Sequence, residues 1–145
     1  MSIAQTTTTS FRVELFEAVH DFTTDTFKIA LYTGSADIGP TTTAYTAVGE
    51  ASGTGYSAGG NTLTVSTQPT YGNNLYGVPT AYMGFANTSW ANASFTARGA
   101  LIYNSSKSNK SVAVLDFGGD KTVTDGTFAV QFPTADANSA IVRIS

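Results

Sequence analysis

The last third of the chain alternates apolar and polar residues in short runs, and this period of two constrains the fold more than any other feature. Four runs lie between Thr96 and Ser145: ARGALIY, SVAVLDF, TFAVQF and AIVRIS. The clusters NSSKSNK, GGDKTVTDG and PTADANS separate them, and such residues are typical of turns. Because the side chains of a strand point alternately to opposite faces, the pattern predicts four half-buried strands joined by turns.

Similar but shorter patterns precede this region. DTFKIALYT at 25–33, NTLTVST at 61–67 and AYMGFAN at 81–87 are predicted strands, and 44–50 is a candidate for a short edge strand. The segment QPTYGNNLYG at 68–77 is predicted to be a long loop. Short strands at this spacing indicate an all-β fold, an antiparallel β-sandwich or barrel-like domain.

One short helix is predicted near the N-terminus. In FRVELFEAVH, at 11–20, Phe11, Leu15 and Val19 share one face, and Ser10 is a candidate N-cap. Residues 1–9 have no apolar periodicity and are predicted to form an extended arm, mobile unless a neighbouring molecule orders it. The predicted organisation is therefore an arm at 1–9 and a single β-rich domain at 10–145.

The composition narrows the class of protein. The chain has 145 residues, a net charge of -3 and only scattered Lys and Arg, which argues against a nucleic-acid-binding protein. It has no cysteine, so disulfides and cysteine-based zinc sites are excluded. The N-terminus resembles no secretory signal, and the apolar runs are shorter than a membrane helix needs, so no membrane partner is expected.

Few side chains are suited to catalysis, since charged residues make up only 12% of the chain and it has one histidine. His20-Asp21 is better explained as the end of the helix followed by a turn than as part of a catalytic triad. Glu14 and Glu17 would share one side of the helix, where they could bind a cation or serve a glycosidase. The spacing of Asp116, Asp120 and Asp125 does not fit a calcium loop. We therefore expect no enzyme, no catalytic residue, no cofactor and no metal site.

Aromatic residues gather between 71 and 90, in the region that is least like regular strands. Such side chains are enriched at protein interfaces, can stack on sugar rings, or can close the end of a core. We interpret the group as a possible protein interface, with core and carbohydrate contact as the alternatives. Its members are Tyr71, Tyr76, Tyr82, Phe85 and Trp90.

Four segments of the chain resemble a family of small virion proteins of tailed bacteriophages, the capsid decoration or cement proteins. They are FRVELFEAVHDFTTDTFKIALYT, EASGTGYSAGG, TARGALIYNSS and SVAVLDFGGDKT, in this order. The resemblance leaves out residues 68–90, which include the whole aromatic group, and it brings no catalytic residues.

The resemblance implies a non-enzymatic structural protein on the outer surface of the phage head, assembled in the bacterial cytoplasm. Its expected partners are the major capsid protein and further copies of itself. A homotrimer is expected, because threefold and quasi-threefold capsid junctions offer three equivalent docking surfaces. The alternative is a phage tail or fibre module that binds glycans of the host surface.

Overall fold

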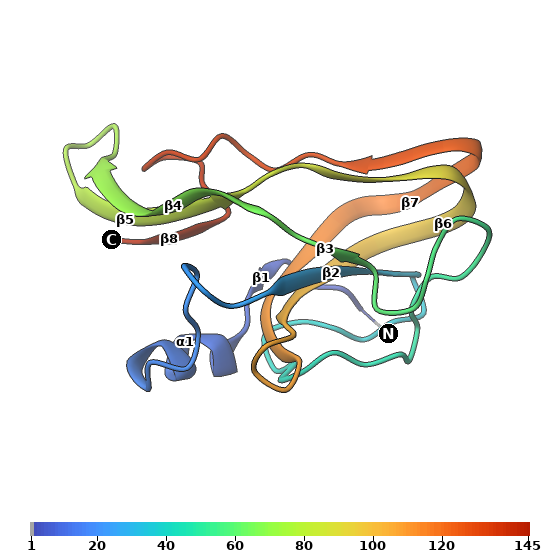
Figure 1. Ribbon diagram of the computed structural model, residues 1–145, viewed down its shortest axis with the longest axis horizontal. Helices are drawn as coiled ribbons and strands as arrows, with labels where there is room; N and C mark the ends of the chain where they lie inside the picture. The colour runs from blue at the N-terminus through green and yellow to red at the C-terminus, as the bar shows by residue number, and fades with distance from the viewer. Residues whose placement is uncertain (1) are drawn as a thin grey trace.

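The computed structural model describes residues 2–145 as two antiparallel sheets with one short helix, which confirms the predicted all-β class (Figure 1). The larger sheet has the order β1-β7-β6-β2-β3, and the smaller sheet has the order β4-β5-β8. The elements are β1 (Thr6–Thr7), α1 (Thr9–Phe16), β2 (Phe27–Tyr32), β3 (Asn61–Thr62), β4 (Val65–Asn73), β5 (Pro79–Phe85), β6 (Thr88–Asn104), β7 (Lys110–Val130) and β8 (Val142–Ile144).

The ribbon of β6 and β7 contributes to both layers of the sandwich-like fold. It curls over at the end of the molecule that lies opposite α1 (Figure 1). The bend coincides with shifts in register, since Ala97 pairs with Lys121 whereas Gly99 pairs with Asp116. Such bulges bend a strand and increase its twist. The prediction that GGDKTVTDG is a turn between two strands is therefore wrong, because this segment continues β7 as its bulged part.

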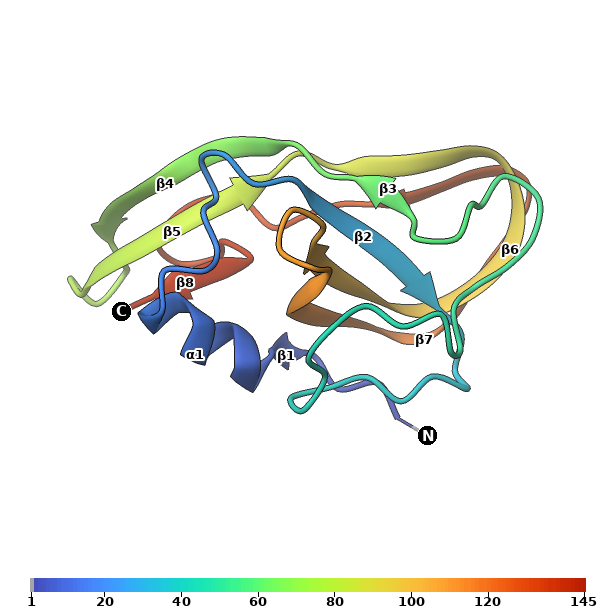
Figure 2. The ribbon, with the colours of Figure 1, turned by 60° about the horizontal axis from the view of Figure 1, so that its bottom comes forward.

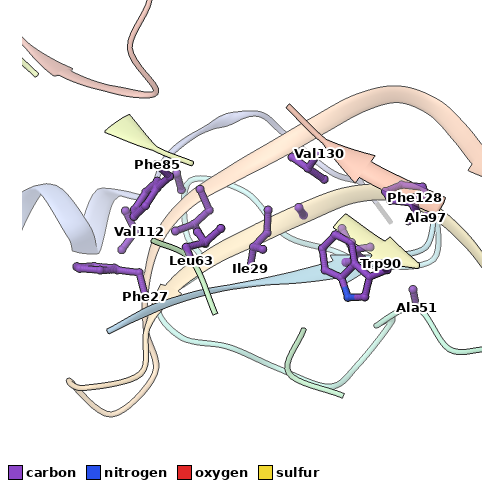
Figure 3. Packing of buried hydrophobic residues seen from close by; sticks show 14 of the residues in the cluster. Phe27, Ile29, Ala51, Leu63, Phe85, Trp90, Ala97, Val112, Phe128 and Val130 are labelled. Atoms are coloured by element: carbon purple, nitrogen blue, oxygen red, sulfur yellow. The ribbon is translucent and has the colours of Figure 1, made fainter. Parts of the chain in front are cut away.

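Strand β2 is buried on both faces, and this explains its nearly continuous run of apolar residues. Phe27, Ile29 and Leu31 face the main core, which fills the space between the two sheets (Figure 3). Ala30 and Tyr32 belong to a second cluster on the other side of the sheet. This second cluster is covered by Ile3, Ile38 and Tyr45, which come from the N-terminal segment and the long loop after β2.

The N-terminal segment is extended, as expected, but it pairs within its own chain. Thr6 and Thr7 lie opposite Val114 and Ala113 of β7, and the amide of Ala4 donates to the carbonyl of Ile38 at 3.0 Å. The prediction that this segment would order only against a neighbouring molecule is therefore wrong. Met1, the first residue of the predicted arm, lies outside the described residues.

The helix is shorter than predicted and begins earlier. Its N-cap is Thr8, whose hydroxyl accepts from the amide of Phe11 at 3.3 Å, so Ser10 lies inside the helix rather than capping it. The Thr8 hydroxyl also lies 2.9 Å from that of Ser111, a bond that joins the start of the helix to β7. The helix ends at Phe16, Glu17 and Ala18 form a turn, and Val19 and His20 follow in irregular backbone.

Two further predictions need correction. Residues 68–77 are not a long loop, because β4 extends to Asn73 and pairs with β5. The polar, glycine- and proline-containing sequence of this segment fits a strand at the open edge of a sheet, where few side chains are buried. The candidate strand at 44–50 is reduced to two isolated bridges, Ala44 with Lys110 and Glu50 with Tyr32.

Candidate functional site

The five aromatic residues of the predicted interface do not form one surface. Tyr71 and Tyr76 are 81% and 91% exposed, on β4 and in the turn between β4 and β5. Tyr82 is half-buried on β5. Phe85 and Trp90 are buried in the core between the sheets (Figure 3). The group therefore divides into two exposed side chains that another molecule can contact, two buried side chains that stabilise the fold, and the half-buried Tyr82.

Exposed apolar side chains gather at one end of the molecule, and most of them were not in the predicted interface. Figures 1 and 2 show α1, the turn between β4 and β5, and β8 at this same end. Phe16 is 94% exposed and Leu75 is 84% exposed. We call this end of the molecule the apolar end, and its exposed apolar side chains include Val13, Phe16, Leu75, Tyr76 and Ile144.

A groove of about 550 Å³ runs along the apolar end, between α1 and β8. Phe11, Leu15 and Phe16 line it from the helix, and Val142 and Ile144 line it from the strand. A second hollow of about 120 Å³ lies beside it, between Leu15 and the strands of the small sheet. The apolar end therefore presents a concave surface as well as projecting side chains.

The turn that carries Leu75 and Tyr76 is held in place by hydrogen bonds. The side-chain oxygen of Asn74 accepts from the amides of Tyr76 and Val78, at 2.9 and 3.0 Å. The amide of Leu75 donates to the side chain of Asn138 at 2.7 Å, which ties the turn to the segment before β8. The exposed apolar side chains therefore project from an ordered turn, and little conformational entropy is lost when a partner binds them.

Sequence reasoning missed Phe16 and Leu75 for identifiable reasons. Phe16 lies off the helix face that carries Phe11 and Leu15, and Leu75 lies in a segment of turn-type residues. Phe16 lies on a helix face where polar residues are expected, and Leu75 lies among turn residues that are usually polar. That mismatch is the signal that could have identified them.

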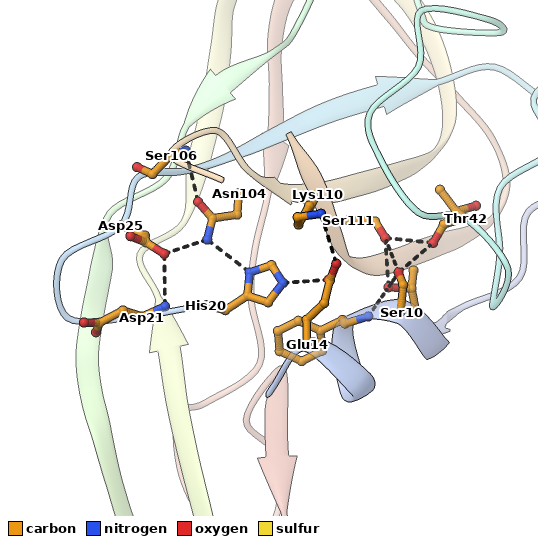
Figure 4. A network of polar contacts seen from close by, with 12 residues as sticks. Ser10, Glu14, His20, Asp21, Asp25, Thr42, Asn104, Ser106, Lys110 and Ser111 are labelled. Carbon is orange, nitrogen blue, oxygen red and sulfur yellow. Dashed lines mark hydrogen bonds and ion pairs between the residues drawn. The ribbon is translucent and has the colours of Figure 1, made fainter. Parts of the chain in front are cut away.

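His20 is a buried link between elements and does not end the helix (Figure 4). Its Nε2 lies 2.9 Å from Glu14 Oε1, and its Nδ1 lies 3.0 Å from the amide nitrogen of Asn104. The same Asn104 nitrogen donates to Asp25 at 2.8 Å. The network connects α1 to the turn between β6 and β7, and His20 therefore stabilises the fold.

The neighbouring carboxylates are also engaged within the chain. Glu14 is shared by His20 and by Lys110, whose Nζ lies 3.5 Å from Glu14 Oε2. Glu17 lies beyond the helix and is exposed, so the two glutamates do not form the pair on one helix face that was considered. The amide and hydroxyl of Thr23 both donate to the Asp21 carboxylate and hold its pKa below the ordinary value.

The aspartates of β7 that were compared with a calcium loop bond within their own chain. Within residues 2–145, no group of three or more metal-ligating side chains could hold an ion. Asp116 accepts from the amide of Gly118 at 2.9 Å, and Asp125 exchanges hydrogen bonds with Ser94. Both therefore stabilise their own bulges, as turn aspartates commonly do.

A second polar cluster surrounds Glu50, which the sequence analysis did not identify. Its carboxylate accepts from the hydroxyls of Tyr45 and Tyr56, both at 2.6 Å, and from the amide of Gly59 at 2.7 Å. Burial, followed by the hydrogen bond to Glu50, raises the pKa of Tyr45 to about 12, and the pKa of Tyr56 is raised for the same two reasons. The cluster ties together separate parts of the long loop between β2 and β3, and the amide of Leu31 in β2 donates to the Tyr56 hydroxyl at 2.9 Å, which joins the cluster to the sheet.

No family model, curated protein or solved structure matches this chain. Among residues 2–145, no helix is long and apolar enough to cross a membrane.

Proposed function

We propose that the chain is a non-enzymatic structural protein of a tailed-phage virion, which decorates the outer surface of the head and bridges neighbouring major capsid subunits. The resemblance of four segments to capsid decoration proteins supports this proposal. So does the use of the titratable side chains: Glu14, His20 and Glu50 all bond within the chain and stabilise the fold.

The observation that carries the proposal is the apolar end. Phe16, Leu75 and Tyr76 are each more than four-fifths exposed, although they come from two elements far apart in the sequence. Apolar side chains that gather on one exposed surface mark an interaction site more often than scattered ones do. Large apolar and aromatic side chains of this kind form the buried centre of protein interfaces.

The mechanism requires no chemical step. A protein that binds only the assembled shell stabilises that state by mass action, and the effect accumulates over every occupied junction. The groove between α1 and β8 would receive an apolar side chain or segment of a capsid subunit, while Phe16 and Tyr76 would pack beside it.

Capsids that lack this protein provide the test. They should break at a lower temperature than complete capsids, and adding the purified protein should restore their resistance. A variant with Phe16→Ser and Leu75→Ser should fail to restore it. Val48→Ser, which changes an apolar side chain that is 77% exposed on the loop between β2 and β3, should restore it fully. Equal resistance of capsids with and without the protein would refute the proposal.

The exposed tyrosines favour a second candidate function, a tail or fibre module that binds glycans of the host surface. Tyr71 and Tyr76 project from a hairpin that carries no charged side chain, and this suits stacking on neutral sugar rings. Copy number separates the two candidates, because a decoration protein is present in hundreds of copies per virion and a tail component in a handful. Quantitative gel electrophoresis of purified virions measures it.

A further inference from the structure

Strand β4 is the longest of the strands that end the two sheets in the described part of the molecule. The two sheets end in four edge strands, β1, β3, β4 and β8. β1 and β3 each have two residues and β8 has three, whereas β4 has nine. An open edge presents unpaired amides and carbonyls, which form a template for pairing with another strand.

The pairing of β4 with β5 shows which backbone groups face the open edge. The amide of Asn74 donates to the carbonyl of Val78 at 3.0 Å, at the end of the hairpin. Because bonded and non-bonded pairs alternate in an antiparallel ladder, Gly72 and Thr70 bond to β5, and the amides and carbonyls of Tyr71 and Asn73 point outward. Pro69, which has no amide hydrogen, limits this regular open stretch to residues 70–73.

The charge distribution points to a second copy of the chain as the occupant. No charged residue occurs between Glu50 and Arg98, so both strands of the hairpin are uncharged. Charged side chains, lysine above all, normally protect open edges against pairing, and β4 has none. The whole chain carries a charge of -3, so two copies repel each other over most of their surfaces but meet no like charges at this edge.

We propose that β4 pairs with β4 of a second copy across a two-fold axis, as an antiparallel pair centred on Gly72. Tyr71 of each chain then lies opposite Asn73 of the other, and both pairs exchange their outward backbone hydrogen bonds. The two small sheets join into one continuous sheet, with the order β8-β5-β4-β4-β5-β8.

The proposal goes beyond the decoration function and does not depend on it, because it concerns purified protein without capsids. It also differs from the homotrimer expected from the resemblance. A two-fold pair uses the same edge of both chains and contains two copies. The mass of the assembly therefore distinguishes this dimer from a trimer.

Sedimentation equilibrium with charge-exchanged variants tests the pairing. The mass of the wild-type protein should rise with concentration from 15.1 kDa toward twice this value. The variant Tyr71→Lys with Asn73→Lys places lysines opposite lysines, and it should remain at the mass of one chain over the same range. The variant Tyr71→Glu with Asn73→Glu should also remain monomeric, whereas an equal mixture of the two variants should recover the mass of two chains.

The mixture also serves as a folding control, because misfolded variants could not recover a specific pair. Val48→Lys, a charge introduced at an exposed site on the loop between β2 and β3, should leave association unchanged. Any of three results would overturn the proposal: a wild-type protein that stays monomeric, an assembly of three chains, or a mixture that stays at the mass of one chain.

Discussion

The long loop between β2 and β3 and the hairpin of β4 and β5 stabilise their conformations in opposite ways. The loop has little regular pairing, but its tyrosines converge on Glu50 and its apolar residues cover the outer face of β2. The hairpin has a regular backbone ladder, yet Tyr71, Leu75 and Tyr76 project from it into solvent. The side chains of the loop are therefore needed for the fold, whereas those of the hairpin tip are available for a partner.

The largest difference in stability between the two regions is expected for alanine substitutions at two glycines with nearly the same backbone conformation. Gly60, at the end of the loop, has φ +74°, and Gly77, in the hairpin turn, has φ +73°. A Cβ at Gly60 would lie 1.8 Å from the carbonyl oxygen of Ile29, whereas one at Gly77 would meet nothing within 4 Å. Gly60→Ala should therefore cost about 3–5 kcal/mol of unfolding free energy, from crowding added to backbone strain.

Gly77→Ala should cost only about 1 kcal/mol, from the left-handed backbone alone. Urea unfolding followed by circular dichroism measures both variants. Equal losses of unfolding free energy in the two variants would show that the loop accommodates a Cβ as easily as the hairpin turn does. The proposed difference between the two regions would then be wrong.

Removing the carboxylate at Glu50 should have the next largest effect. Glu50→Ala leaves two tyrosine hydroxyls and the amide of Gly59 without their acceptor, and we expect a loss of about 3 kcal/mol in unfolding free energy. Glu17→Ala, which removes an exposed glutamate, should change the unfolding free energy by less than about 0.5 kcal/mol. A loss at Glu50 as small as that at Glu17 would mean that apolar packing alone holds the loop.

Alkaline pH should weaken the loop before the hairpin. The pKa of Tyr45 is raised from 10.0 to about 12, mainly by burial, so the folded protein retains a proton that the unfolded chain releases. The resulting stability is complete below pH 10 and is lost as the pH rises toward 12. Hydrogen exchange at rising pH, corrected for the intrinsic rate, should show opening of residues 45–59 first. If β4 and β5 opened at the same pH as residues 45–59, the prediction that ionisation of Tyr45 weakens the loop first would be wrong.

The smallest effect on stability is expected at the hairpin tip. Leu75→Ser and Tyr76→Ser replace side chains that are 84% and 91% exposed, so the unfolding free energy should change by no more than about 0.5 kcal/mol. Thermal unfolding of the two variants measures this. A loss comparable to that of a core substitution would show that these side chains stabilise the fold and are not kept for a partner.

The sequence predicted the fold class because burial enforces its pattern in the strands of the core. β2 and β5 were found because Phe27, Ile29 and Phe85 must face the core. β4 was missed because an edge strand with few buried side chains needs no apolar period. The continuity of β7 was missed because a bulge uses the same residues as a turn, here with Gly118 at φ +80°.

The candidate site was less predictable than the fold. Tyr71 and Tyr76 were identified by residue type, but Trp90 and Phe85 share that type and are buried. What separates them is the position of each side chain relative to the two sheets, which depends on pairings between distant segments. The Glu50 cluster shows the same limit, because Tyr45, Tyr56 and Gly59 meet the carboxylate only when the irregular loop folds back on itself.

The position and orientation of this chain in a reconstruction of the virion would test the central claim most directly. The claim predicts density for the chain at the junctions of major capsid subunits, with Phe16, Leu75 and Tyr76 directed at the shell and Val48 directed at solvent. A chain on the head with the opposite orientation would contradict the assignment of the apolar end as the docking surface. A chain found only in the tail would contradict the decoration function itself.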